Sequence, residues 1–153
     1  MNLSWPRYFF TLAESISKKS KDESTQVGCV LTNKDNEILS VGFNGFPRGV
    51  KDLKERYSNR ELKYKLIVHS EMNAVAIAAK NGHRLEGSRL FIAWLPCSSC
   101  AKILIQTGIT EINIDGLSKQ YNNKELQERW KEEIDLSTLM FNEAGVKINI
   151  IME

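Results

Sequence analysis

Two short motifs constrain the fold more than any other feature of the sequence. They are His69-Ser70-Glu71 and, further along the chain, Pro96-Cys97-Ser98-Ser99-Cys100. Together they supply one imidazole, two thiols and one carboxylate. Imidazole and thiolate are good zinc ligands, and three protein ligands leave a fourth coordination position open for water. A fold that uses these residues together must bring two separate parts of the chain to one point.

The residue types in the two motifs are those of a hydrolytic zinc site. We expect His69, Cys97 and Cys100 to bind one Zn²⁺ ion, and bound zinc lowers the pKa of a coordinated water to about 7. Glu71 lies two residues from the imidazole, where its carboxylate can move protons between that water and a substrate nitrogen. Glu71 is therefore the candidate catalytic residue.

Two other interpretations of the Cys-x-x-Cys motif are weaker. A structural zinc normally has four protein ligands, and only Cys29 and His83 remain as spare residues of these types. Neither lies in a motif that indicates a fourth ligand. A redox pair would not require His69 and Glu71 ahead of it. The pattern favours a catalytic zinc over both alternatives.

Both motifs are expected at the beginning of helices. The first precedes a run of apolar residues with helical spacing that ends at Asn81-Gly82. The second follows the strand-like run 90–94 and starts with Pro96, which suits the first turn of a helix. Cys97 and Cys100 are three residues apart and so share one helical face, and a helix N-terminus favours thiolate. The sequence predicts two helix beginnings that face one metal ion.

The other apolar patterns predict helices alternating with strands. Trp5, Phe9, Leu12 and Ile16 recur at helical spacing, so we expect a first helix with all four packed on the core. Strands are expected at 27–31, 38–43, 90–94, 111–115 and 146–150, with the first two forming a hairpin and the last an outer strand. The charged segment 51–65 is expected to be solvated. This order predicts an α/β fold, namely a three-layer α/β/α sandwich with a mixed, mostly parallel sheet of about five strands.

Length and composition exclude several classes of protein. The 153 residues are enough for a single domain, spanning 1–153, with a sizeable core. A net charge of +2 gives little reason to expect a nucleic-acid partner. No apolar run approaches the roughly 20 residues that span a bilayer, and the first residues lack the layout of a signal peptide. Three cysteines give no disulfide framework, so we expect a cytoplasmic protein.

Several stretches resemble the cytidine and deoxycytidylate deaminase superfamily, and most closely its deoxycytidylate (dCMP) deaminases. Besides the two zinc motifs, the matching stretches cover most of the chain and occur in the family's order. They are Trp5-Pro6-Arg7-Tyr8-Phe9, 18–22, Thr25-Gln26-Val27-Gly28, Gly42-Phe43-Asn44-Gly45-Phe46-Pro47-Arg48-Gly49, 100–109 and Glu143-Ala144-Gly145-Val146. The chain departs from the family at Ser70, where most relatives carry Ala, and over 119–135, which is longer.

The resemblance implies a cytidine deaminase-like fold and an enzyme that hydrolyses dCMP to dUMP and ammonia, which supplies dUMP for thymidylate synthesis. It assigns His69, Cys97 and Cys100 to the zinc ion. Glu71 would protonate N3 of the cytosine ring and then help the amino group to leave. Some relatives carry a second, structural zinc, but this chain has too few spare ligands, so we expect a single ion.

The resemblance also implies residues that contact the substrate and its effectors. Asn44 would contact the sugar, and the backbone at Ser70 would hold the edge of the pyrimidine. The residues expected to contact the phosphate are Lys21, Ser24, Thr25 and Tyr121. Many family members are hexamers activated by dCTP and inhibited by dTTP, and this effector site would involve Arg48, Gly49 and Asp52.

Three alternatives to a dCMP deaminase remain open at this point. The enzyme could act on dCTP, either instead of dCMP or in addition to it. A nucleic-acid-editing deaminase would need a basic, aromatic-lined channel, of which a nearly neutral chain gives little sign. A non-catalytic, zinc-stabilised binding module would be unaffected by Glu71→Gln. The extended resemblance favours an enzyme acting on free nucleotides.

Overall fold

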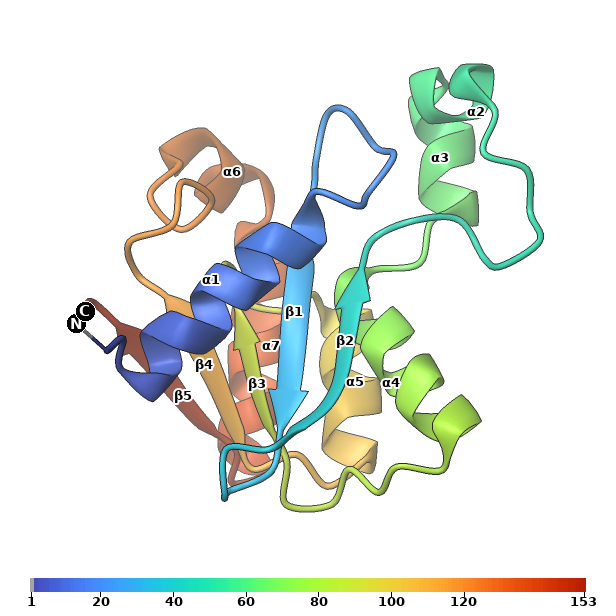
Figure 1. Ribbon diagram of the computed structural model, residues 1–153. Helices are drawn as coiled ribbons and strands as arrows, with labels where there is room; N and C mark the ends of the chain where they lie inside the picture. The colour runs from blue at the N-terminus through green and yellow to red at the C-terminus, as the bar shows by residue number, and fades with distance from the viewer. Residues whose placement is uncertain (1) are drawn as a thin grey trace.

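A five-stranded sheet lies at the centre of the computed structural model, which describes residues 2–153 (Figure 1). The strand order is β2-β1-β3-β4-β5. The bounds are β1 Gly28–Thr32, β2 Ile38–Phe43, β3 Arg89–Ile92, β4 Glu111–Asp115 and β5 Lys147–Ile151. β1 is antiparallel to both of its neighbours, and the β3–β4 and β4–β5 pairs are parallel. Four strands therefore run in one direction, which confirms the mixed, mostly parallel sheet, and β5 is the expected outer strand.

Helices cover both faces of this sheet (Figure 1). Helix α1, Trp5–Ser17, crosses one face. Helices α4, Ser70–Asn81, α5, Ser98–Gln106, and α7, Lys131–Glu143, lie against the other. The three layers confirm the predicted α/β/α sandwich. Among the described residues, no helix combines the length and the apolar composition needed to cross a membrane.

The core has two parts because successive side chains of a strand point to opposite faces. Val30 of β1 and Phe91 of β3 face α1, where they pack with Phe9 and Phe10. The next residue in β1, Leu31, belongs to the larger cluster, together with residues of α4, α5 and α7. The largest fully buried side chains of that larger cluster include Leu31, Leu90, Ile92, Leu104, Ile112 and Phe141.

One prediction about α1 is wrong. Trp5 was expected in the core, but 55% of its surface is exposed. It lies in the first turn of the helix and stacks on Phe9, with ring centroids 5.7 Å apart, so its outer face remains in solvent. The buried residues of α1 are Phe9, Phe10 and Ala13.

Three short helices lie beyond the carboxyl ends of the parallel strands (Figure 1). They are α2, Lys54–Ser58, α3, Arg60–Leu66, and α6, Lys124–Arg129. The charged segment 51–65 is mostly exposed, as expected, but Lys63 is only 7% exposed. Its Nζ lies 3.2 Å from Asp22 Oδ2 and donates a 2.8 Å hydrogen bond to Ser24 Oγ. This buried ion pair connects α3 to the loop that precedes β1.

Candidate active site

The two metal-binding motifs begin two helices, as predicted, and both helices lie on the same face of the sheet. His69 is the N-cap of α4 and Cys97 is the N-cap of α5. Both caps have extended backbone, with ψ angles of 156° and 169°, and neither side chain caps its own helix. The two side chains are therefore free to turn toward a shared ligand. Helical arithmetic alone would place His69 and Glu71 on different sides, but the extended cap removes this conflict.

The position of α4 depends on a close approach by β2. A Cβ atom built on Gly42 would lie 2.2 Å from the carbonyl oxygen of Ser70 and 2.6 Å from the amide nitrogen of Ala74. Both neighbours are backbone atoms of the first turns of α4, which cannot swing aside as a flexible side chain can. The missing side chain at Gly42 thus allows the strand to touch the helix directly behind the site.

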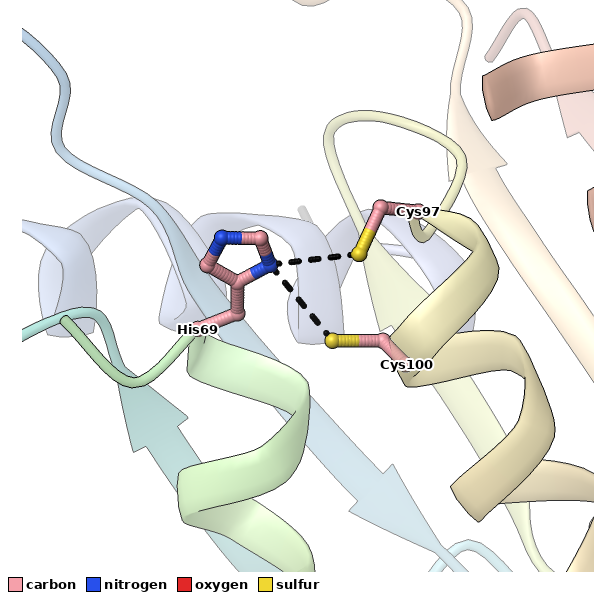
Figure 2. A group of neighbouring side chains, drawn as sticks. All are labelled: His69, Cys97 and Cys100. Carbon is pink, nitrogen blue, oxygen red and sulfur yellow. Dashed lines mark hydrogen bonds between the residues drawn. The ribbon is translucent and has the colours of Figure 1, made fainter. Parts of the chain in front are cut away.

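The three candidate ligands converge as zinc requires (Figure 2). His69 Nδ1 lies 3.4 Å from the Sγ of Cys97 and 3.5 Å from the Sγ of Cys100. A tetrahedral ion with ordinary Zn–N and Zn–S bonds needs an N···S separation of about 3.6 Å. The donor set therefore fits one zinc ion with a fourth position left open. Among residues 2–153, this group is the one whose His, Cys, Asp or Glu ligand atoms gather closely enough for a metal.

The ligands also interact with one another. The pKa of Cys97 is lowered, first by a hydrogen bond with the Cys100 thiol and then by one with His69. The neighbouring Cys97 thiolate and burial raise the pKa of Cys100, and contact with Cys97 raises the pKa of His69 to about 8. Among the three ligand side chains, the proton is therefore held least tightly by Cys97. Zinc binding must displace protons from His69 and Cys100.

Glu71 lies on the same cavity as the ligands and is only 5% exposed. Its Oε1 accepts a 2.6 Å hydrogen bond from the fully buried Ser70 hydroxyl. This contact holds one oxygen of the carboxylate in place. The Cys29 thiol contacts Ser70 from β1, and burial raises its pKa, so it stays neutral and outside the donor set.

The cavity beside the ligands has a volume of about 160 Å³. This is smaller than the roughly 300–1,000 Å³ of pockets that enclose a drug-sized ligand, so it suits a group the size of one base. Its lining includes His69, Glu71 and Cys97. The apolar side chains of the lining include Val27, Ile67, Trp94, Leu95, Leu126 and Trp130. We call it the inner cavity.

A second, larger cavity of about 590 Å³, which we call the outer cavity, adjoins the inner one. The two share Asp22, Thr25, Lys63, Tyr64 and Arg129 as lining residues. The outer cavity is lined by five basic side chains, Lys21, Lys54, Arg60, Lys63 and Arg129, and by three acidic ones, Asp22, Glu23 and Asp52. Its lining therefore has an excess of positive charge, and such an excess favours an anionic group.

The structure gives the predicted substrate residues different surroundings. Asn44 is buried and lines the inner cavity. Its side-chain amide also holds the loop before β1 in place: Oδ1 accepts a hydrogen bond from the Val27 backbone amide, and Nδ2 donates one to the Thr25 carbonyl. Thr25 lines both cavities. Ser24 lines the outer cavity, where its hydroxyl donates to Asp22 Oδ1. Tyr121 packs against the larger core cluster instead of lining either cavity.

The candidate effector residues are also separated. Asp52 lines the outer cavity and pairs with Lys21 at 3.0 Å, a contact that holds the pKa of Asp52 below its usual value. Arg48 and Gly49 lie in an exposed turn outside the lining of both cavities. The structure therefore brings Asp52 and Lys21 together and leaves Arg48 and Gly49 apart from them.

Sequence reasoning missed several residues that line the cavities. Lys63 comes from the charged segment that was expected to be solvated, and Arg129 and Trp130 come from the long segment 119–135. A tryptophan beside an arginine in a polar stretch was the available signal for the last two. No local pattern distinguished Lys63 from its exposed neighbours.

A His/Cys/Cys donor set with an open position, beside a buried carboxylate, is the arrangement of a zinc-dependent hydrolase. The profile of the family "cytidine and deoxycytidylate deaminase zinc-binding region" matches residues 3–115. The chain belongs to this family.

Individual relatives agree with this assignment. The chain is 41% identical to an "uncharacterized deaminase in luxG 3′region" from Aliivibrio fischeri, with 94% of this chain and 91% of that protein aligned. It is 34% identical to human deoxycytidylate deaminase over 94% of this chain and 78% of the relative. The crystal structure of dCMP deaminase from the cyanophage S-TIM5, in complex with dCMP and dUMP, matches with a TM-score of 0.74 at 24% identity and covers 99% of both chains. This last likeness concerns the fold.

Proposed function

We propose that the protein converts dCMP and water to dUMP and ammonia in a zinc-dependent hydrolysis. The observation that carries this proposal is the arrangement of the two cavities. A base-sized, mostly apolar cavity is lined by Glu71 and by two of the metal ligands, His69 and Cys97, and it adjoins a larger cavity with excess positive charge. A nucleoside would need only the first, whereas a nucleotide uses both. The similarity to deoxycytidylate deaminases supports the same substrate.

Glu71 performs the proton transfers in this reaction. A zinc ion held by His69, Cys97 and Cys100 would lower the pKa of its bound water to near 7. The Glu71 carboxylate takes a proton from the attacking water, delivers it to ring N3 and then assists proton transfer to the departing amino group. Ser70 keeps the carboxylate oriented through its hydrogen bond. The apolar walls around Trp94 and Trp130 exclude bulk water from the base.

We place the 5′-phosphate of the substrate in the outer cavity. Asp22 and Asp52 compensate Lys63 and Lys21. The remaining basic residues of the outer cavity, Lys54, Arg60 and Arg129, form no ion pair within residues 2–153. Of these three, Arg129 also lines the inner cavity, so it is nearest to the junction between base and phosphate.

The decisive experiment compares dCMP with deoxycytidine, using the loss of cytosine absorbance as the readout. Arg129→Ala should reduce kcat/KM for dCMP by about tenfold or more, in keeping with the loss of one charge-assisted contact, and leave deoxycytidine unchanged. Arg84→Ala, a charge change outside both cavities, is the control. Equal kcat/KM for the two substrates in the wild-type enzyme, or turnover only of a single-stranded oligonucleotide, would contradict the proposal.

The size of the outer cavity supports a second candidate substrate. A volume of about 590 Å³ offers room for more than one phosphate, so dCTP belongs in the same assay.

We also propose a cytoplasmic, single-domain enzyme that forms homohexamers, with dCTP as activator and dTTP as inhibitor. The similarity of residues 42–49 to the family's loop and the place of Asp52 in the outer cavity support an effector role for this region. Turnover measured with and without each effector tests the regulation, and light scattering tests the number of subunits.

A further inference from the structure

The beginning of α5 carries both zinc thiols, so its geometry decides whether they can meet His69. Cys97 is the N-cap and Cys100 is the third residue of the helix. The first amides of a helix have no partner within it and need acceptors from elsewhere. The Cys97 side chain makes no capping hydrogen bond to the helix. The amide of Ser98, which follows Cys97, is one of these first amides and is open to an acceptor from another element.

Glu133 of α7 provides that acceptor. Its Oε2 accepts a 2.8 Å hydrogen bond from the backbone amide of Ser98, the residue directly after Cys97. Glu133 is partly buried, and α7 packs along α5. A carboxylate at this place is favourable because the N-terminus of a helix carries partial positive charge. The contact joins α7 to the short piece of backbone that lies between the two metal ligands.

We propose that Glu133 is a positioning residue of the metal centre. Its carboxylate holds the first turn of α5 in the geometry in which Cys97 and Cys100 both reach His69, and so increases zinc affinity without contacting the metal. Groups that orient metal ligands in this way typically contribute about 10–100-fold in metal affinity or activity. The inference concerns the binding of zinc and does not depend on the identity of the substrate.

The first test measures the dissociation constant of zinc by competition with a chromophoric chelator. Glu133→Ala removes the acceptor and should raise the dissociation constant about 10–100-fold. Glu133→Gln keeps an oxygen that can accept the hydrogen bond, so most of the affinity should remain. Glu132→Ala makes the same charge change at the exposed neighbouring position and should leave the dissociation constant within about twofold of the wild-type value, the usual range for an exposed site.

A double-mutant cycle tests the contact itself. Ser98→Pro removes the amide hydrogen that Glu133 accepts. Proline suits the first position of a helix, and the extended backbone of Cys97, with ψ of 169°, is compatible with a following proline. Ser98→Pro should weaken zinc binding by itself, and adding Glu133→Ala should then cause little further loss. If the losses of zinc affinity from the two substitutions instead multiply, Glu133 does not act through the Ser98 amide, and the proposal is overturned.

Two further readouts separate positioning from general stability. Circular dichroism and thermal unfolding of each metal-free variant show whether the fold is intact at the temperature of the zinc titration. In the cobalt(II)-substituted protein, Glu133→Ala should shift or weaken the thiolate-to-cobalt absorption, and Glu132→Ala should not. If the alanine variant does not fold without metal, Glu133→Met keeps the length of the side chain and takes its place. An unchanged zinc dissociation constant and cobalt spectrum in a folded variant without the carboxylate would refute the proposal, as would an equal loss in Glu132→Ala.

Discussion

The buried ion pair between Lys63 and Asp22 provides a quantitative test of how α3 is attached to the molecule. Their side chains are 9% and 4% exposed, and they are 3.2 Å apart. Replacing Lys63 with Met removes the cation but leaves the carboxylate of Asp22 buried. Removing one partner of a buried pair typically costs about 3–5 kcal/mol. For a protein of this size each 1 kcal/mol corresponds to a shift of about 2–4 °C in Tm, so Lys63→Met should lower the Tm by about 6–20 °C.

The structure offers a matched control for this substitution. Lys21 and Asp52 form an ion pair at 3.0 Å, but their side chains are 66% and 34% exposed. Exposed pairs contribute about 0–1 kcal/mol, so Lys21→Met should change the free energy of unfolding by no more than about 1 kcal/mol. Both variants are compared by urea denaturation of the zinc-loaded protein, followed by circular dichroism.

A double variant separates the uncompensated charge from lost packing. Adding Asp22→Asn to Lys63→Met removes the buried negative charge, so more than half of the lost stability should return. If Lys63→Met costs no more than Lys21→Met, the buried pair has no special role in stability. If the double variant is no more stable than Lys63→Met alone, the loss comes from packing of the lysine stem, and the electrostatic reasoning is wrong.

Three other outcomes follow from the site. Glu71→Gln should remain folded and zinc-loaded by metal analysis, with kcat lowered by about 10²–10⁴-fold, the usual contribution of acid–base catalysis; retained turnover would contradict its role. Zinc affinity should fall by about tenfold or more per pH unit as the pH decreases from 8 to 6. The reason is that the pKa of His69 is raised to about 8 and its proton must leave before zinc binds. A zinc affinity that does not change over this pH range would contradict the role of the His69 proton. Chelation of zinc should lower the Tm, since a ligand that binds only the folded state stabilises it, and adding zinc back should restore it.

The metal site could be predicted from sequence because local patterns determine it. His69, Cys97 and Cys100 precede or begin helices whose starts are marked by the residues around them, and the structure confirms both beginnings. Strands 38–43 and 111–115 also match the structure, since clear turn residues bound them. In each case, the information lies within a few residues of the element.

The remaining features depend on partners that are distant in sequence. Lys63 is buried because Asp22 lies opposite it, and no pattern within 51–65 reveals this. The contact between Glu133 and Ser98 spans 35 residues. Trp5 fits the periodicity of a core residue, but the first turn of α1 leaves it exposed. Periodicity predicts which side of a helix is apolar, whereas tertiary packing decides how far along the helix that side is covered.

The close approach at Gly42 has a consequence for which substitutions the enzyme can tolerate. Gly42 lines neither cavity, yet every larger side chain would collide with backbone atoms of α4 at 2.2 and 2.6 Å. In a library that samples all amino acids at each position, Gly42 should therefore be as intolerant as His69. Gly45, three residues later, has open space around its Cβ position and no positive φ, so many variants should survive there. Two glycines of one loop motif would thus differ completely in the variation they permit.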